Sequence, residues 1–118
     1  GGAYGPNYSA EHVAEAVVMA EKANVTPSLM IDCSHGNSSK DPELQPVVLQ
    51  EVIKQIPDGN QNIHAVMLES NLNAGKQTFP QPLENLEYGV SITDGCLDWQ
   101  TTETALREAY AALDFRLS

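Results

Sequence analysis

The chain has 118 residues, of which 42% are hydrophobic, and its 16 acidic and 6 basic residues give a formal net charge of −10. This length fits one domain with a modest core, and the acidic balance excludes a nucleic-acid binder, which needs a basic surface. Two cysteines are too few for a disulfide scaffold, so a reducing cytoplasm is the expected location. No apolar run approaches transmembrane length, so we expect no membrane partner.

The chain opens with a loop and a helix. Residues 1–8 hold three glycines and a proline, which is typical of a loop. Ser9 offers an N-cap for a helix that runs to about Asn24, a residue suited to a left-handed C-terminal cap. The apolar spacing predicts that the buried face of this helix carries Val13, Ala16, Val17 and Ala20.

Two short apolar segments, residues 28–33 and 63–68, predict buried strands, and the first runs into a polar loop over residues 34–40. A helix is expected between them, with Asp41 as its N-cap and Pro42 as its first residue, ending at residues 57–59. The buried face of this helix is predicted to carry Val48, Leu49, Val52, Ile53 and Ile56.

A long segment without periodicity and a last helix complete the chain. Residues 70–100 are not of low complexity, so we predict an ordered active-site loop, with Trp99 anchoring it against the last helix. That helix is expected to begin near Thr101 or Thr102 and to pair Glu103 with Arg107. Its packed face is predicted to carry Leu106, Ala109, Tyr110 and Leu113.

The predicted order is helix, strand, helix, strand, long loop, helix, which indicates an α/β fold with a parallel sheet covered by helices. Two strands are fewer than a usual sheet holds, so the pattern suggests a piece of a larger α/β fold. Open strand edges and apolar faces also favour self-association, and a homo-oligomer is expected.

Three side chains stand near the ends of the apolar segments or in the long loop: His35, Glu69 and Asp94. The carboxyl ends of parallel strands are where α/β folds bind ligands. One imidazole and two carboxylates converging there would suit a divalent metal. Strand alternation adds that His35 would share a face with Cys33, and Glu69 with Met67.

Each of these residues also has an ordinary explanation. A histidine after a strand is usually a loop hydrogen-bonder, and a glutamate there is usually solvated. Cys33 and His35 could alternatively be a nucleophile and its base, but the pair has no evident orienting acid, and a buried cysteine usually acts as a small hydrophobe.

The basic residues are scattered along the chain. Only Lys40 and Lys76 lie in predicted loops. The other four fall on predicted helices or in the C-terminal tail: Lys22, Lys54, Arg107 and Arg116.

Four segments together carry a family resemblance: GPNYSAEHVAE, LMIDCSHGNSSK, AVMLESNL and YGVSITDGCLDW. In order and spacing they resemble class I 3-deoxy-7-phosphoheptulonate (DAHP) synthases over nearly the whole chain. The resemblance implies that residues 1–118 are the C-terminal segment of a single (β/α)8 TIM-barrel domain. It also implies the reaction of that family, condensation of phosphoenolpyruvate with erythrose 4-phosphate, the first step of the shikimate pathway.

The resemblance further implies a divalent metal of the Mn, Fe, Co or Zn type. His35, Glu69 and Asp94 would be three of its four protein ligands, and the fourth, a cysteine, is matched by no residue here. Asp94 would also act in catalysis, and Asn37 and Lys40 would contact substrate beside His35. With a ligand and most basic residues missing, the isolated chain is expected to be inactive and its metal site weakly occupied.

Two other functions stay open at this point. One is a non-catalytic metal-binding or interaction module that reuses these segments. The other is a small thiol hydrolase built on Cys33 and His35.

Overall fold

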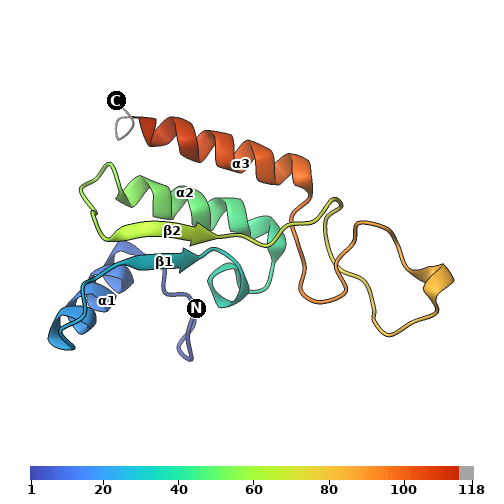
Figure 1. Ribbon diagram of the computed structural model, residues 1–118, viewed down its shortest axis with the longest axis horizontal. Helices are drawn as coiled ribbons and strands as arrows, with labels where there is room; N and C mark the ends of the chain where they lie inside the picture. The colour runs from blue at the N-terminus through green and yellow to red at the C-terminus, as the bar shows by residue number, and fades with distance from the viewer. Residues whose placement is uncertain (115–118) are drawn as a thin grey trace.

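The computed structural model describes residues 1–114, so Arg116 lies outside the described part of the chain. The elements follow the predicted order (Figure 1): α1 (Ala10–Lys22), β1 (Leu29–Asp32), α2 (Gln45–Gln55), β2 (Ile63–Met67) and α3 (Trp99–Ala112). Short 3-10 turns occupy His35–Ser38, Pro42–Leu44 and Leu83–Asn85. Within residues 1–114, no helix is long and apolar enough to cross a membrane.

The two strands are parallel, as predicted, and pair from Leu29 with Ile63 to Asp32 with Met67. Parallel neighbours need a crossover connection, and α2 supplies it between β1 and β2. Both carboxyl ends therefore lie at the same edge of the sheet, where the polar segments that follow each strand come together.

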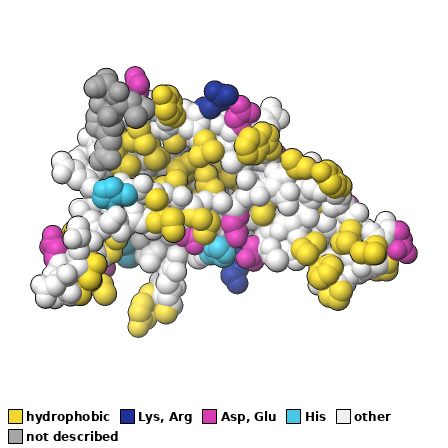
Figure 2. Space-filling view, viewed as in Figure 1, with side chains coloured by type: hydrophobic (Ala, Val, Ile, Leu, Met, Phe, Trp, Pro, Cys, Tyr) yellow, Lys and Arg dark blue, Asp and Glu magenta, His cyan; other side chains and the backbone are white. Residues whose placement is uncertain are grey.

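The core lies on one face of this sheet, the face that all three helices cover. Side chains of β1, β2 and each helix meet there, and the buried cluster comprises Val13, Ile31, Cys33, Val48, Leu49, Val52, Ile53, Ile56, Ile63 and Ala105. Met30, which alternates with Ile31 on β1, is 66% exposed on the opposite face. Figure 2 shows hydrophobic side chains exposed over the strands. One face of the sheet is thus packed and the other is open.

The predicted caps are confirmed for α1. The Ser9 hydroxyl accepts a hydrogen bond from the His12 amide, and Asn24 follows the helix with a φ of 57°. Val13 is its fully buried apolar residue, which agrees with the predicted face.

The second helix differs from its prediction at the start. Asp41 caps a separate 3-10 turn over Pro42–Leu44, and α2 begins only at Gln45. Pro46 explains the break, because a proline lacks the amide hydrogen that a continuous helix would need there and is tolerated only in a first turn. The buried face of α2 is as predicted.

The last helix begins earlier than predicted, because Asp98 is its N-cap and accepts a hydrogen bond from the Thr101 amide at 2.6 Å. Its packed stripe is also shifted. Ala109 and Leu113 pack against the core, as predicted. Leu106 and Tyr110, however, are 45% and 66% exposed, and Thr102 and Ala105 are buried instead, so the other half of the predicted face is wrong. The predicted ion pair of Glu103 with Arg107 is present.

The long segment between β2 and α3 extends away from the body as an arm (Figure 1). Backbone bridges close its base, joining Ser70 to Leu97 and Gly75 to Cys96. Leu97 and Cys96 are buried there, whereas the Trp99 side chain is 56% exposed, so Trp99 is not the predicted anchor. Leu97 and Cys96 fix the base of the arm instead.

Candidate metal centre

His35 lies just beyond the carboxyl end of β1, where the chain leaves the sheet. It begins a 3-10 turn with a φ of 49°, a left-handed backbone that is uncommon outside glycine. The alternation of a strand therefore stops before His35. The prediction that His35 shares a face with Cys33 is wrong, because Cys33 points into the core while His35 turns toward the polar edge.

Glu69 follows β2, and neighbouring residues hydrogen-bond to both its main chain and its side chain. The buried Gln45 amide accepts from the Glu69 backbone N–H at 2.8 Å and donates to the Glu69 carbonyl at 3.2 Å. The Ser34 hydroxyl donates to Glu69 Oε2 at 2.7 Å. The glutamate thus has a fixed backbone, and its other oxygen, Oε1, remains for a further partner.

Asp94 lies on the returning segment of the arm, next to its base, and it reaches the strand ends because this base closes. Leu97 N–H donates to the Glu69 carbonyl at 3.0 Å, and Gly75 and Cys96 exchange two backbone hydrogen bonds. These bonds bring a residue that is distant in sequence next to His35 and Glu69.

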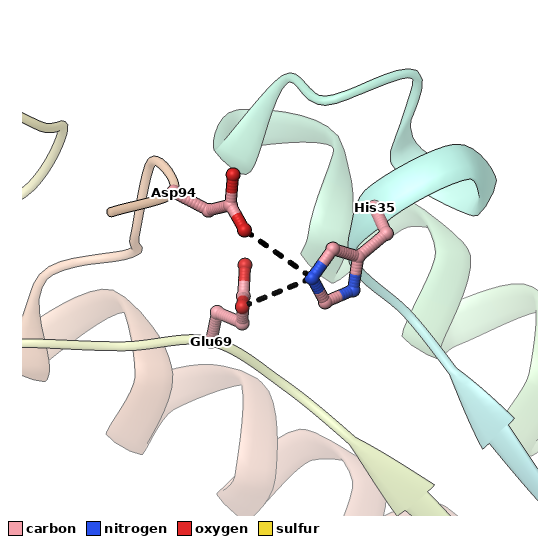
Figure 3. A group of neighbouring side chains, drawn as sticks. All are labelled: His35, Glu69 and Asp94. Atoms are coloured by element: carbon pink, nitrogen blue, oxygen red, sulfur yellow. Dashed lines mark ion pairs between the residues drawn. The ribbon is translucent and has the colours of Figure 1, made fainter.

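The three side chains converge on one point (Figure 3). His35 Nε2 lies 3.2 Å from Glu69 Oε1 and 3.4 Å from Asp94 Oδ2. One ligand atom from each residue lies within 4.8 Å of the other two. An imidazole nitrogen with two carboxylate oxygens is a donor set that fits a divalent cation of borderline to hard character. Among residues 1–114 this is the only such cluster of three potential ligands.

A third acidic residue beside this cluster, Asp32, was not identified from the sequence. Its Oδ2 lies 2.9 Å from His35 Nδ1, on the side of the ring away from the cluster. This hydrogen bond raises the pKa of His35; desolvation opposes the shift, and the charges of Glu69 and Asp94 reinforce it. The sequence signal for this contact was an aspartate three residues before a histidine. In a continuous strand these two side chains would point to opposite faces, so the alternation used for the prediction did not indicate the contact.

The cluster lines a pocket of about 110 Å³ at the strand ends. Lys40 and Lys76, the two lysines from predicted loops, both line it, beside Pro42 and Gly95. The pocket therefore offers two positive side chains next to three potential metal ligands.

Asn37 is placed differently. Its amide oxygen accepts from the Asn7 backbone N–H at 2.7 Å, and its amide nitrogen donates to the Asp32 carbonyl at 2.7 Å. It is buried and does not line this pocket. A substrate contact by Asn37 stays a prediction, and both ends of its amide already bind protein.

Cys33 does not offer a nucleophile. Its side chain is fully buried, and burial, with a smaller contribution from the Asp32 charge, raises its pKa to about 12. A thiol in that environment stays protonated and inaccessible. The thiol-hydrolase reading is therefore not supported.

The other two histidines have ordinary partners. His12 Nδ1 lies 2.7 Å from the Ser9 hydroxyl at the start of α1, and His64 Nδ1 lies 3.0 Å from the Asn62 carbonyl. His12 also lines a wider hollow of about 620 Å³ between α1 and α2, which holds no cluster of ligand-type side chains.

Taken together, the parallel strands and the cluster at their carboxyl ends define an α/β protein with a candidate metal centre. Comparison with known proteins narrows this class. The sequence model of the DAHP synthetase I family matches residues 1–107. The chain belongs to the DAHP synthetase I family.

Characterised relatives agree with this assignment. The chain is 50% identical to the Tyr-sensitive phospho-2-dehydro-3-deoxyheptonate aldolase of Enterobacter agglomerans and 46% identical to that of Escherichia coli, over 99% of the chain in both cases. It covers 55% and 33% of those two proteins. The solved phospho-2-dehydro-3-deoxyheptonate aldolase of Francisella tularensis superposes with a TM-score of 0.90 at 43% identity, over 98% of this chain and 33% of that one.

Proposed function

We propose that this chain is the C-terminal part of a DAHP synthase that condenses phosphoenolpyruvate with erythrose 4-phosphate. The observation that carries the proposal is the convergence of His35 Nε2 with the Glu69 and Asp94 carboxylates in a member of this family. The chain spans only part of its relatives, so the activity belongs to a longer polypeptide that contains these residues.

Within that polypeptide, β1 and β2 would be two adjacent strands of a (β/α)8 barrel. The arrangement of the layers supports this proposal. Helices cover one face of the sheet, and the other face is open and bears the exposed Met30. A barrel places helices outside and strand side chains inside, with the active site at the carboxyl ends of the strands.

The residues of the cluster fit a divalent metal of the Mn, Fe, Co or Zn type, because they combine one imidazole nitrogen with carboxylate oxygens. When bound, such a metal polarises the aldehyde carbonyl of the sugar phosphate. His35 and Glu69 would hold it from the two strand ends. Asp94 would hold it from the arm and contact the substrate side.

Lys40 follows the polar 3-10 turn that begins at His35. This lysine would contact an anionic substrate. It lines the same pocket as the cluster, and its backbone N–H binds the His35 carbonyl at 2.8 Å. A lysine so close to the site would attract the phosphate or carboxylate of either substrate. Lys76 lines the pocket from the opposite segment and adds to the same field.

A homo-oligomer and a cytoplasmic location stay predictions for the complete polypeptide. A non-catalytic metal-binding module remains the second candidate. The family membership of residues 1–107 favours the synthase over that module.

The proposal is tested on the complete polypeptide with His35→Ala. Because His35 supplies the nitrogen ligand, bound metal and the release of phosphate from the two substrates should both fall, the latter by at least about 100-fold, on the scale of lost transition-state charge stabilisation. His64→Ala is the matched control, since His64 lies on β2 away from the cluster. Unchanged metal content with unchanged turnover in His35→Ala would contradict the proposal.

A further inference from the structure

We propose that Asp32 is a positioning residue of the metal centre, holding His35 so that Nε2 presents its lone pair to a divalent cation. The inference rests on the proposed function, because it assigns a partner to a proposed metal ligand. Asp32 is the last residue of β1, so its backbone is fixed by the sheet.

The Asp32 side chain is held from both sides. Its Oδ1 accepts from the Ser34 backbone N–H at 2.8 Å, and its Oδ2 lies 2.9 Å from His35 Nδ1. The Asp32 carbonyl also accepts from the Asn37 side chain at 2.7 Å. The carboxylate therefore cannot rotate without breaking a bond to the main chain.

These contacts select one tautomer of His35. A backbone N–H can only donate, so it fixes Oδ1 as an acceptor, and the ionised carboxylate leaves Oδ2 as an acceptor as well. Nδ1 must then carry the hydrogen, and the neutral ring keeps its lone pair at Nε2. Nε2 is the atom that faces Glu69 Oε1 at 3.2 Å and Asp94 Oδ2 at 3.4 Å.

Packing alone does not fix the ring. The His35 side chain is 44% exposed, and its backbone has left the strand. The bond to Asp32 is the hydrogen bond that orients it from the side opposite the cluster.

Asp32 is not itself one of the clustered ligands. Its nearest contact to the ring is at Nδ1, the nitrogen that points away from Glu69 and Asp94, and the group of mutually close ligand atoms does not include it. Its role is therefore to act through His35.

The variant Asp32→Asn, made in the complete polypeptide, tests whether Asp32 acts through His35. An asparagine has one acceptor and one donor end, so it can satisfy Ser34 only by turning its NH₂ toward His35 Nδ1. That choice moves the ring hydrogen to Nε2 and blocks the cation. The Ser34 contact and the size of the side chain are retained, so the fold should survive.

Calorimetric titration with Co²⁺ at one fixed pH gives the readout. We expect Asp32→Asn to weaken Co²⁺ binding by roughly 10–100-fold, the usual effect of removing such an outer partner. Asp58→Asn, an exposed aspartate after α2, makes the same charge change and should bind like the wild type. Co²⁺ affinity of Asp32→Asn equal to that of Asp58→Asn would overturn the inference.

A second measurement keeps the inference testable if the variant does not fold. The ¹⁵N imidazole shifts of His35 in the wild type loaded with diamagnetic Zn²⁺ should show hydrogen on Nδ1 and the metal at Nε2; the metal at Nδ1 would overturn it. If His35→Ala abolishes Co²⁺ binding while Asp32→Asn does not change it, the inference alone fails. A wild type that binds no Co²⁺ overturns the proposed function and the inference with it.

Discussion

At the scale of single residues, two consecutive side chains at the end of β1, those of Asp32 and Cys33, have opposite environments. Cys33 is buried in the core, while Asp32 faces the polar edge and binds His35. The same short segment thus supplies both packing and the orientation of a ligand. A cysteine two residues from a histidine resembles a catalytic pair in the sequence, but in three dimensions their side chains lie on different sides of the strand end.

The first prediction concerns the Cys33 thiol. Burial raises the folded-state pKa of this thiol from 9.0 to about 12, so the native thiol stays neutral. The stability linked to the neutral thiol is fully present below the unfolded-state pKa and is lost as the pH rises from there through the folded-state pKa. We expect iodoacetamide at pH 8 to leave Cys33 unmodified in the native protein and to modify it after unfolding in urea. Mass spectrometry of the alkylated peptides measures both. Rapid modification of native Cys33 would show an accessible thiolate and revive the hydrolase reading.

At the scale of elements, the first turn of α2 connects the helix to the site. Gln45 is fully buried and forms two hydrogen bonds with the main chain of Glu69. The helix therefore determines where the glutamate stands, although it supplies no ligand itself. This explains why a polar side chain occupies the apolar side of α2.

The second prediction is that Gln45→Ala loosens Glu69. It leaves the Glu69 amide and carbonyl without these partners, which should cost about 1–3 kcal/mol of unfolding free energy and weaken metal binding. Urea unfolding and Co²⁺ titration measure the two effects. Gln50→Ala is the control on the same helix, because Gln50 is exposed and its side chain hydrogen-bonds to Glu108 at 3.4 Å rather than to Glu69. Equal stability and affinity for both variants would contradict this role of Gln45.

Sequence reasoning predicted the strands, their parallel order and the buried face of α2, because apolar runs and caps are local signals. It failed where a distant contact decides the outcome. The shifted stripe of α3 depends on how that helix packs, and the role of Asp32 depends on the left-handed backbone at His35. The ligand set itself came from the family resemblance, since spacing alone left ordinary explanations open.

At the scale of the whole molecule, the chain is an acidic body of two strands and three helices from which an arm extends. Its dimensions of 52 × 35 × 19 Å describe a flat body, and the arm exposes Phe79, Leu83 and Tyr88. Figure 2 shows hydrophobic side chains gathered on the arm, at the right, and separately over the strands. Such a surface is typical of a part that packs against further protein.

The third prediction is that the isolated 118 residues do not catalyse the condensation. Two multiply anionic substrates require preorganised positive charge. This chain has a net charge of −10, and among residues 1–114 only Lys40 and Lys76 are basic residues that line the site. When both substrates are mixed with the isolated chain and excess divalent metal, we expect no release of phosphate. The rate of phosphate release by the complete polypeptide is the reference. Metal-dependent turnover that Glu69→Ala abolishes would show instead that these residues suffice.

The central claim is that His35, Glu69 and Asp94 together bind one divalent metal. Anomalous diffraction from crystals of the complete polypeptide, soaked in Mn²⁺ or Co²⁺, tests it most directly. We predict a single strong peak within about 2.0–2.3 Å of His35 Nε2 and of one oxygen each from Glu69 and Asp94, the usual range for such ligands. A peak at another site, or at His35 Nδ1 with Asp32, would contradict the claim.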